Sequence, residues 1–172
     1  MTSKPPKVID HIADLRRYAL ALTRSSQDAE DLVQETLARA YDRLSDFRQG
    51  EALRPWLMSI LHNLHVDGLR SRMVQEKHAA TADIRKDFAP ASQEHALRLS
   101  EIRRAFLALP VEQREALHLV GVEGLTYPEA SQVLGVPEGT VLSRVSRARQ
   151  ALRDREHMPA PFLRVVGGSD GA

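Results

Sequence analysis

Apolar residues recur every three or four positions along most of this chain, which is the spacing of one buried face of an α-helix. The pattern predicts helices near residues 8–23, 26–44, 55–72, 94–109, 110–120, 126–134 and 138–155. Only 5% of the residues are aromatic, a low share that suits small helical bundles better than a β-sandwich. The chain is therefore predicted to be all-α.

The helical periodicity stops between residues 73 and 93, and a stretch of about 20 residues is long for a loop inside one compact domain. We therefore predict two small helical domains joined by a flexible linker. The predicted boundaries are a disordered leader at 1–7, a first domain at 8–72, the linker at 73–93, a second domain at 94–156 and a flexible tail at 157–172.

Residues 126–155 have the pattern of a helix-turn-helix. The first helix ends at Gly135, where a left-handed residue can terminate it, and Pro137 leads into the second. The apolar face of the second helix contains Val141, Val145, Ala148 and Leu152. Its opposite face contains Thr140, Ser143, Arg144 and Arg147, with Arg149 and Arg153 on the flank. Hydroxyls and guanidiniums near the start of such a helix can read base edges in a major groove. A helical hairpin with a solvated arginine face is the alternative.

The composition limits the possible partners and compartments. Although 27% of the 172 residues are charged, the formal net charge is only +1, so any DNA contact must come from locally clustered charge. The chain has no cysteine, which excludes disulfides and thiolate metal sites and fits a reducing compartment. Neither a signal-peptide core nor an apolar run near the roughly 20 residues of a membrane span is present, so a cytoplasmic protein is expected.

Two further polar groups have both a structural and a functional interpretation. Asp28, Asp31, Gln34 and Glu35 lie together off the apolar face of helix 26–44, either as solvated surface or as a docking edge for a basic partner. His62 and His65 have the spacing of a metal pair, but no third ligand is evident, so no metal site is predicted. Since the sequence offers neither a nucleophile–base pair nor a phosphate-binding glycine loop, no cofactor and no enzymatic activity are expected.

Three stretches, in this order, resemble the sigma-70 family of bacterial transcription initiation factors, specifically the small extracytoplasmic-function (group 4) kind. Residues 28–41 (DAEDLVQETLARAY) are similar to region 2.2, residues 47–72 to regions 2.3 and 2.4, and residues 109–153 to region 4. The lack of regions 1.1 and 3 fits this subgroup. The run REALHLVG at residues 114–121 is similar to the branch that controls the general stress response in alphaproteobacteria.

The resemblance implies a role for each group of residues. The first domain would be a region 2 helical bundle, whose docking edge on the core polymerase is Asp28, Asp31, Gln34 and Glu35. The melted −10 element would be held by the loop at 46–54 and by Phe47, Trp56, Asn63, Asp67, Arg70 and Arg72. The second domain would be region 4, whose −35 contacts are Glu138, Thr140, Ser143, Arg144, Arg147 and Arg149.

The sequence departs from the family's usual pattern at Leu142, where a basic residue is frequent, and at His62, His65 and Gly68. The last three predict a −10 preference different from that of relatives. The resemblance implies RNA polymerase core enzyme, promoter DNA and an anti-sigma factor as partners, without membrane insertion. Two alternatives remain: a sigma-like decoy that sequesters an anti-sigma factor, and a helix-turn-helix regulator that binds operators as a homodimer.

Overall fold

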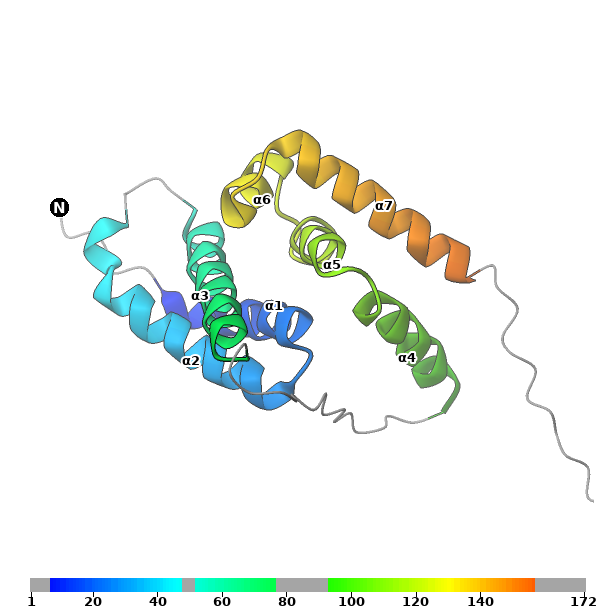
Figure 1. Cartoon of the computed structure of the whole chain (residues 1–172), viewed down its shortest axis with the longest axis horizontal. Coiled ribbons are helices and arrows are strands. Elements are labelled where there is room, and N and C mark those ends of the chain that lie inside the picture. The colour runs from blue at the N-terminus through cyan, green and yellow to red at the C-terminus, as the bar shows by residue number, and fades with distance from the viewer. Residues whose placement is uncertain (1–6, 48–51, 77–92, 157–172) are drawn as a thin grey trace, which may run out of the picture.

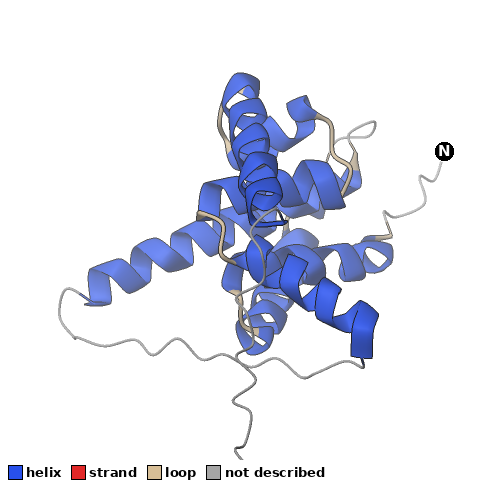
Figure 2. Ribbon diagram, turned by 90° about the vertical axis from the view of Figure 1, so that its right-hand side faces the viewer, coloured by secondary structure: helices blue, strands red, loops and turns tan. Residues whose placement is uncertain are grey.

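The computed structural model describes residues 7–47, 52–76 and 93–156, and this part of the chain folds into helices without strands (Figure 2). The predicted all-α class is therefore confirmed for these residues. The N-terminal module contains η1 (Val8–His11), α1 (Ile12–Thr23), α2 (Ser26–Asp42), η2 (Leu44–Asp46) and α3 (Leu53–Glu76). The C-terminal module contains α4 (Gln93–Leu107), α5 (Val111–Leu117), the π-helical turn η3 (His118–Val122), α6 (Tyr127–Leu134) and α7 (Glu138–Glu156). Most of the predicted leader and linker, and the predicted tail, lie outside the described residues.

In the N-terminal module, α2 packs between α1 and α3. The chain turns from α1 into α2 at Arg24, whose φ of 60° is left-handed, and Ser25 then caps α2 by accepting a hydrogen bond from the Asp28 backbone N–H at 3.3 Å. The apolar faces point inward: Leu15, Leu32 and Leu61 are buried, and Ile12, Leu37 and Leu64 are half-buried. Ile9 is 69% exposed because it lies in the 3₁₀ turn η1, whose tighter period does not continue the face of α1.

In the C-terminal module, α5 and α6 both pack against α7. A capping box starts α6: the Thr126 hydroxyl accepts from the Glu129 backbone N–H at 3.3 Å, and the Glu129 carboxylate accepts from the Thr126 N–H at 2.8 Å. Gly135 ends α6 with a φ of 64°, as predicted. Ile102 lies at the helical spacing that predicts a buried face for residues 94–109, but it is 45% exposed, since residues 101–104 of α4 face solvent.

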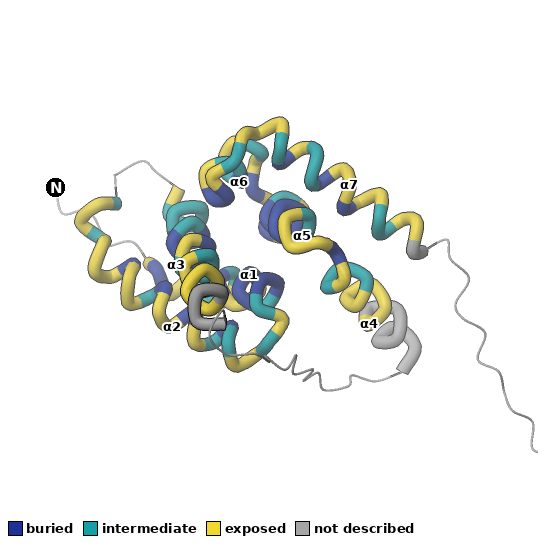
Figure 3. Tube along the Cα trace, viewed as in Figure 1, coloured by how far each residue is buried: buried dark blue, intermediate teal, exposed yellow. Residues whose placement is uncertain are grey.

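The two modules pack against each other, an arrangement that the sequence did not predict. Helix α6 contacts α3, while α5 and η3 contact α1 (Figure 1). The buried residues of both modules form one continuous cluster, and buried positions run along α1, α3 and α5 (Figure 3). We call the contact between the modules the seam. In the described part of the chain, no helix is long and apolar enough to cross a membrane.

Candidate functional site

The acidic residues predicted on α2 form an accessible edge. Asp31, Gln34 and Glu35 are exposed and Asp28 is half-buried. Two apolar neighbours on the opposite side, Leu32 and Val33, hold this orientation because they are buried against the rest of the module. The edge therefore presents three carboxylates to any basic surface that approaches α2.

A groove of about 380 Å³ runs beside this edge, between α2, α3 and α5. Three of the predicted docking residues line it, namely Asp28, Asp31 and Glu35. Arg72 of α3 and Arg114 of α5 also line it. The same groove contains two apolar side chains that are partly open to solvent, Leu69 and Val111, at 41% and 37% exposure. Acidic, basic and apolar groups thus meet in one concave surface that includes both modules.

The predicted −10 residues lie at the start of α3 and along it. Phe47 and Trp56 are brought together, with ring centroids 5.2 Å apart and planes inclined at 56°. The polar members Asn63, Asp67, Arg70 and Arg72 are all exposed. Residues 48–51 of the predicted −10 loop lie outside the described residues. The structure therefore places an aromatic pair beside an exposed polar helix face.

The predicted −35 residues lie on α7 between Glu138 and Arg149. Glu138, Arg147 and Arg149 are exposed, while Thr140, Ser143 and Arg144 are half-buried. The Ser143 hydroxyl donates to the Thr140 carbonyl at 2.9 Å, so its oxygen is free to act chiefly as an acceptor. Leu142 is 54% exposed on the same stretch and offers only apolar contact.

His62, one of the two histidines of α3, is buried against Tyr18 and has a structural role. Tyr18, which is 0% exposed, places its hydroxyl 3.2 Å from Nδ1 of His62. Burial, together with the charges of His65 and Arg144, lowers the pKa of His62 to about 4, so the ring is neutral at physiological pH. No group of three or more potential metal ligands exists among the residues that the structure describes.

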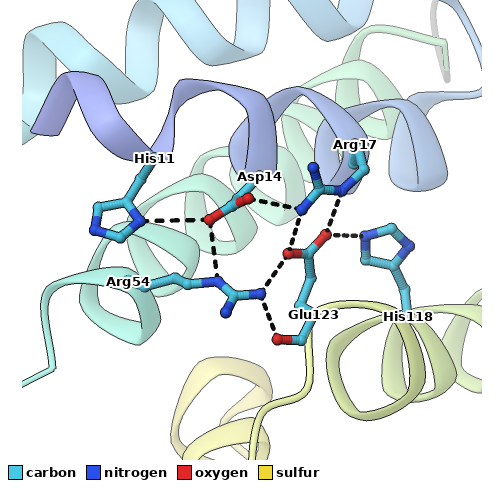
Figure 4. A network of polar contacts seen from close by, with 6 residues as sticks. All are labelled: His11, Asp14, Arg17, Arg54, His118 and Glu123. Atoms are coloured by element: carbon cyan, nitrogen blue, oxygen red, sulfur yellow. Dashed lines mark hydrogen bonds and ion pairs between the residues drawn. The ribbon is translucent and has the colours of Figure 1, made fainter.

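The seam contains buried charged residues that sequence reasoning missed. Glu123 follows η3, and its side chain is 0% exposed. Its carboxylate accepts hydrogen bonds from Arg17 of α1 and Arg54 of α3 in the N-terminal module, and from His118 in its own module (Figure 4). Burial tends to raise the pKa of Glu123, but these three donors outweigh it and lower the pKa to about 2. The carboxylate is therefore ionised throughout the physiological range.

A buried cation joins the modules at a second point. Arg114 is 3% exposed, and its Nε donates to the carbonyl of Ala21, near the end of α1, at 2.6 Å. Its Nη1 donates to the carbonyls of Leu107 and Leu109 at 3.2 and 3.0 Å. One guanidinium therefore satisfies carbonyls at the ends of two helices, α1 and α4, where the helix dipole favours a cation. The ring of His118 stacks on Tyr18 nearby, with centroids 5.4 Å apart.

Each of the two modules matches a family of known proteins. Residues 8–74 match the family model of sigma-70 region 2, and residues 99–152 match that of sigma-70 region 4. The ECF RNA polymerase sigma factor EcfG of Rhodopseudomonas palustris is 37% identical over 171 residues, which cover 95% of this chain and 94% of that protein. The ECF sigma factor SigM of Bacillus subtilis is 31% identical over 151 residues, covering 83% of this chain and 88% of that protein.

Two solved structures resemble the fold over most of the chain. The sigma factor RpoE in complex with the anti-sigma factor NepR from Bartonella quintana gives a TM-score of 0.77 at 33% identity, covering 90% of this chain and 96% of that one. CnrH in complex with the cytosolic domain of CnrY gives a TM-score of 0.66 at 26% identity, covering 89% of this chain and 86% of that one. Family matches in both modules and a relative aligned over nearly its whole length establish that the chain belongs to the sigma-70 family, as an extracytoplasmic-function RNA polymerase sigma factor.

Proposed function

We propose that the acidic edge of α2 docks this sigma factor on core RNA polymerase, while α3 and α7 contact the two promoter elements. The observation that carries the proposal is the separation of charge over the fold. Asp31 and Glu35 are exposed on one helix of the N-terminal module, and Arg147 and Arg149 are exposed on the last helix of the C-terminal module. With a net charge of only +1, the chain needs this separation to bind a basic protein surface and DNA at once.

At the −10 element, Phe47 and Trp56 would provide an aromatic surface for an unpaired base, with Asn63 and Asp67 reading its polar edge. Arg70 and Arg72 would contact phosphates. Arg70 pairs only weakly with Asp67, at 3.9 Å and with both side chains more than two-thirds exposed, so little free energy opposes a switch to a phosphate.

At the −35 element, α7 would enter the major groove. Arg144 and Arg147 are the candidates for base contacts because guanidinium groups can pair with guanine through two hydrogen bonds. Glu138, Thr140, Ser143 and Arg149 would contact neighbouring bases or phosphates.

An anti-sigma factor would bind in the groove between the modules. RpoE and CnrH, which this chain resembles, are each described in complex with such an inhibitor or its domain. The groove offers Leu69 and Val111 for apolar contact beside Asp28, Asp31 and Glu35. A bound inhibitor helix would thereby cover the polymerase-docking edge. The run at residues 114–121, which is similar to the general-stress-response branch, favours a role in that response. The factor would act in the cytoplasm, without a cofactor or catalysis of its own.

Run-off transcription with core enzyme tests the proposal directly. The factor should produce a promoter-specific transcript, which neither a decoy nor an operator-binding homodimer would give. The double substitution Asp31→Lys and Glu35→Lys should abolish co-elution with core enzyme, since it reverses two exposed charges. Asp42→Lys, an exposed reversal at the end of the same helix, is the matched control and should co-elute normally. Unchanged co-elution of the double variant would refute the docking assignment.

A further inference from the structure

The Glu123 carboxylate pairs with two arginines on the other side of the seam. Arg17 forms a two-point pair with the carboxylate, from Nε to Oε1 at 3.1 Å and from Nη2 to Oε2 at 3.0 Å. Arg54 donates from Nη2 to Oε2 at 2.6 Å, and the same nitrogen also donates to the Glu123 backbone carbonyl. Charge-assisted pairs of this geometry are among the strongest hydrogen bonds in proteins.

The two arginines are held in place from their own module. Asp14 of α1 lies 2.6 Å from Nη2 of Arg17 and 3.2 Å from Nε of Arg54, and His11 lies 3.4 Å from the same carboxylate (Figure 4). Asp14 therefore fixes both guanidiniums at the place where Glu123 arrives. The N-terminal module presents a preformed site for one carboxylate, and the C-terminal module supplies that carboxylate.

Arg114 makes the reverse contact. It carries a positive charge from the C-terminal module to the end of α1, where it bonds the carbonyl of Ala21. The N-terminal module thus binds both an anionic and a cationic side chain of the C-terminal module.

We infer that Glu123 and Arg114 form an intramolecular latch, which closes the two modules on each other when no partner is bound. Glu123 is the main determinant, because its buried carboxylate pairs with two cations of the other module. The chain then holds itself in an inactive arrangement, and an inhibitor binds a state that already exists.

The functional consequence rests on the proposed function. Elements centred at −10 and −35 lie about 25 base pairs apart, or about 85 Å at roughly 3.4 Å per base pair. Modules that share one buried cluster cannot engage both elements at once. Closure also brings Val111 and Arg114 of the C-terminal module into the groove that Asp28 and Asp31 line, so the other module borders the polymerase-docking edge. Opening of the latch must therefore precede promoter binding.

Distance measurements on the full chain test the latch without any partner. The chain has no native cysteine, so Ala38→Cys on α2 and Ser146→Cys on α7, both exposed, can carry a pair of fluorescent dyes. The unsubstituted pair should show one high-transfer population. Glu123→Gln should raise the ratio of open to closed molecules at least about tenfold, because two guanidiniums lose their counter-charge. Glu30→Gln, which removes the exposed partner of Arg16 inside one module, is the matched control and should change nothing.

Two outcomes would overturn the latch: transfer in Glu123→Gln equal to that of the parent, or a parent that is already open. Circular dichroism checks that the variant keeps its helices. If it does not, Arg17→Gln serves instead, because it removes the same pair from the other module and should likewise raise the open fraction.

Transcription with core enzyme tests the consequence. Glu123→Gln should reach half-maximal transcript at a several-fold lower concentration than the parent, because a larger fraction of molecules is competent. An opened variant with an unchanged half-maximal concentration would refute the regulatory role. If neither protein gave a transcript, the proposed function would fail, while the distance measurement would still decide whether the latch exists.

Discussion

The buried carboxyl group of Glu115 should make the stability of this protein fall as pH rises through neutrality. Glu115 lies on α5 at the seam and is 6% exposed. Burial raises its pKa to about 7, against the opposing charges of Arg114 and Arg144, whereas the ordinary value is 4.5. The perturbation is Glu115→Gln, which keeps the shape of the side chain and cannot ionise.

The sign and size of the effect follow from linkage. A folded-state pKa above the unfolded value means that the native state binds the proton more tightly. The stabilisation that the protonated Glu115 contributes is therefore complete below pH 4.5. This contribution is lost between pH 4.5 and 7, because over that range the unfolded chain releases the proton and hydrates the carboxylate while the folded protein still holds the proton. At about 1.4 kcal/mol per pKa unit, the full difference is about 3 kcal/mol. Glu115→Gln should therefore match the parent near pH 4 and exceed its unfolding free energy by up to about 3 kcal/mol at pH 8.

Urea unfolding monitored by circular dichroism, repeated from pH 4 to pH 8, measures this difference. Glu101→Gln, which removes an exposed carboxyl of α4 that does not influence Glu115, is the matched control and should show no such trend. A gain in Glu115→Gln that stayed constant over the whole range would mean that packing, and not ionisation, separates the two proteins. A loss of stability at pH 8 would show that the ionised carboxylate makes a favourable contact.

Three other substitutions test separate features. Arg114→Met should lower the unfolding free energy, measured by urea unfolding, by about 3–5 kcal/mol because three carbonyls lose a cationic donor. The control is Arg104→Met at an exposed position of α4. A loss below about 1 kcal/mol would contradict the capping role of Arg114. Thr126→Ala removes the capping box and should lower the unfolding free energy by about 1 kcal/mol, which a lower melting temperature would show. An unchanged melting temperature would show that α6 does not need the cap. Arg144→Ala should weaken use of −35 sequences by about 1–3 kcal/mol in competition transcription assays if it reads a base pair. Equal weakening on every promoter would make it a phosphate contact.

The helices and their ends were largely predictable because their signals are local. Ser25, Thr126 and Gly135 act within one helical turn of their own positions, and the apolar faces of α2 and α7 follow from spacing alone. The sequence pattern was wrong for Ile9 and Ile102, where an apolar residue lies beyond the packed part of its helix. Periodicity cannot show where a neighbouring helix stops covering the surface.

The seam was not predictable from local pattern, since its pairs join residues far apart in the chain. Arg17 and Glu123 are 106 positions apart. Arg16 and Arg17 are adjacent and chemically identical, yet one pairs with Glu30 on the surface and the other crosses to the second module. A partial signal existed on α5: Arg114 precedes the buried Leu117 and His118 by three and four positions, which places it on the apolar face. A charged residue at such a position indicates a buried partner.

The distribution of buried polar groups fits an interface that has to open. Among the described residues, the buried polar and charged side chains are Thr36, His62, Arg114, Glu115, His118 and Glu123. Thr36 bonds the backbone of its own helix, whereas each of the others lies on the seam or beside Tyr18. Separating two apolar faces would leave both exposed to aggregation, but water can hydrate carboxylates, guanidiniums and imidazoles after they part. The polar groups within the seam therefore give a closed state that is specific in register and still reversible, which a wholly apolar seam of the same area would not.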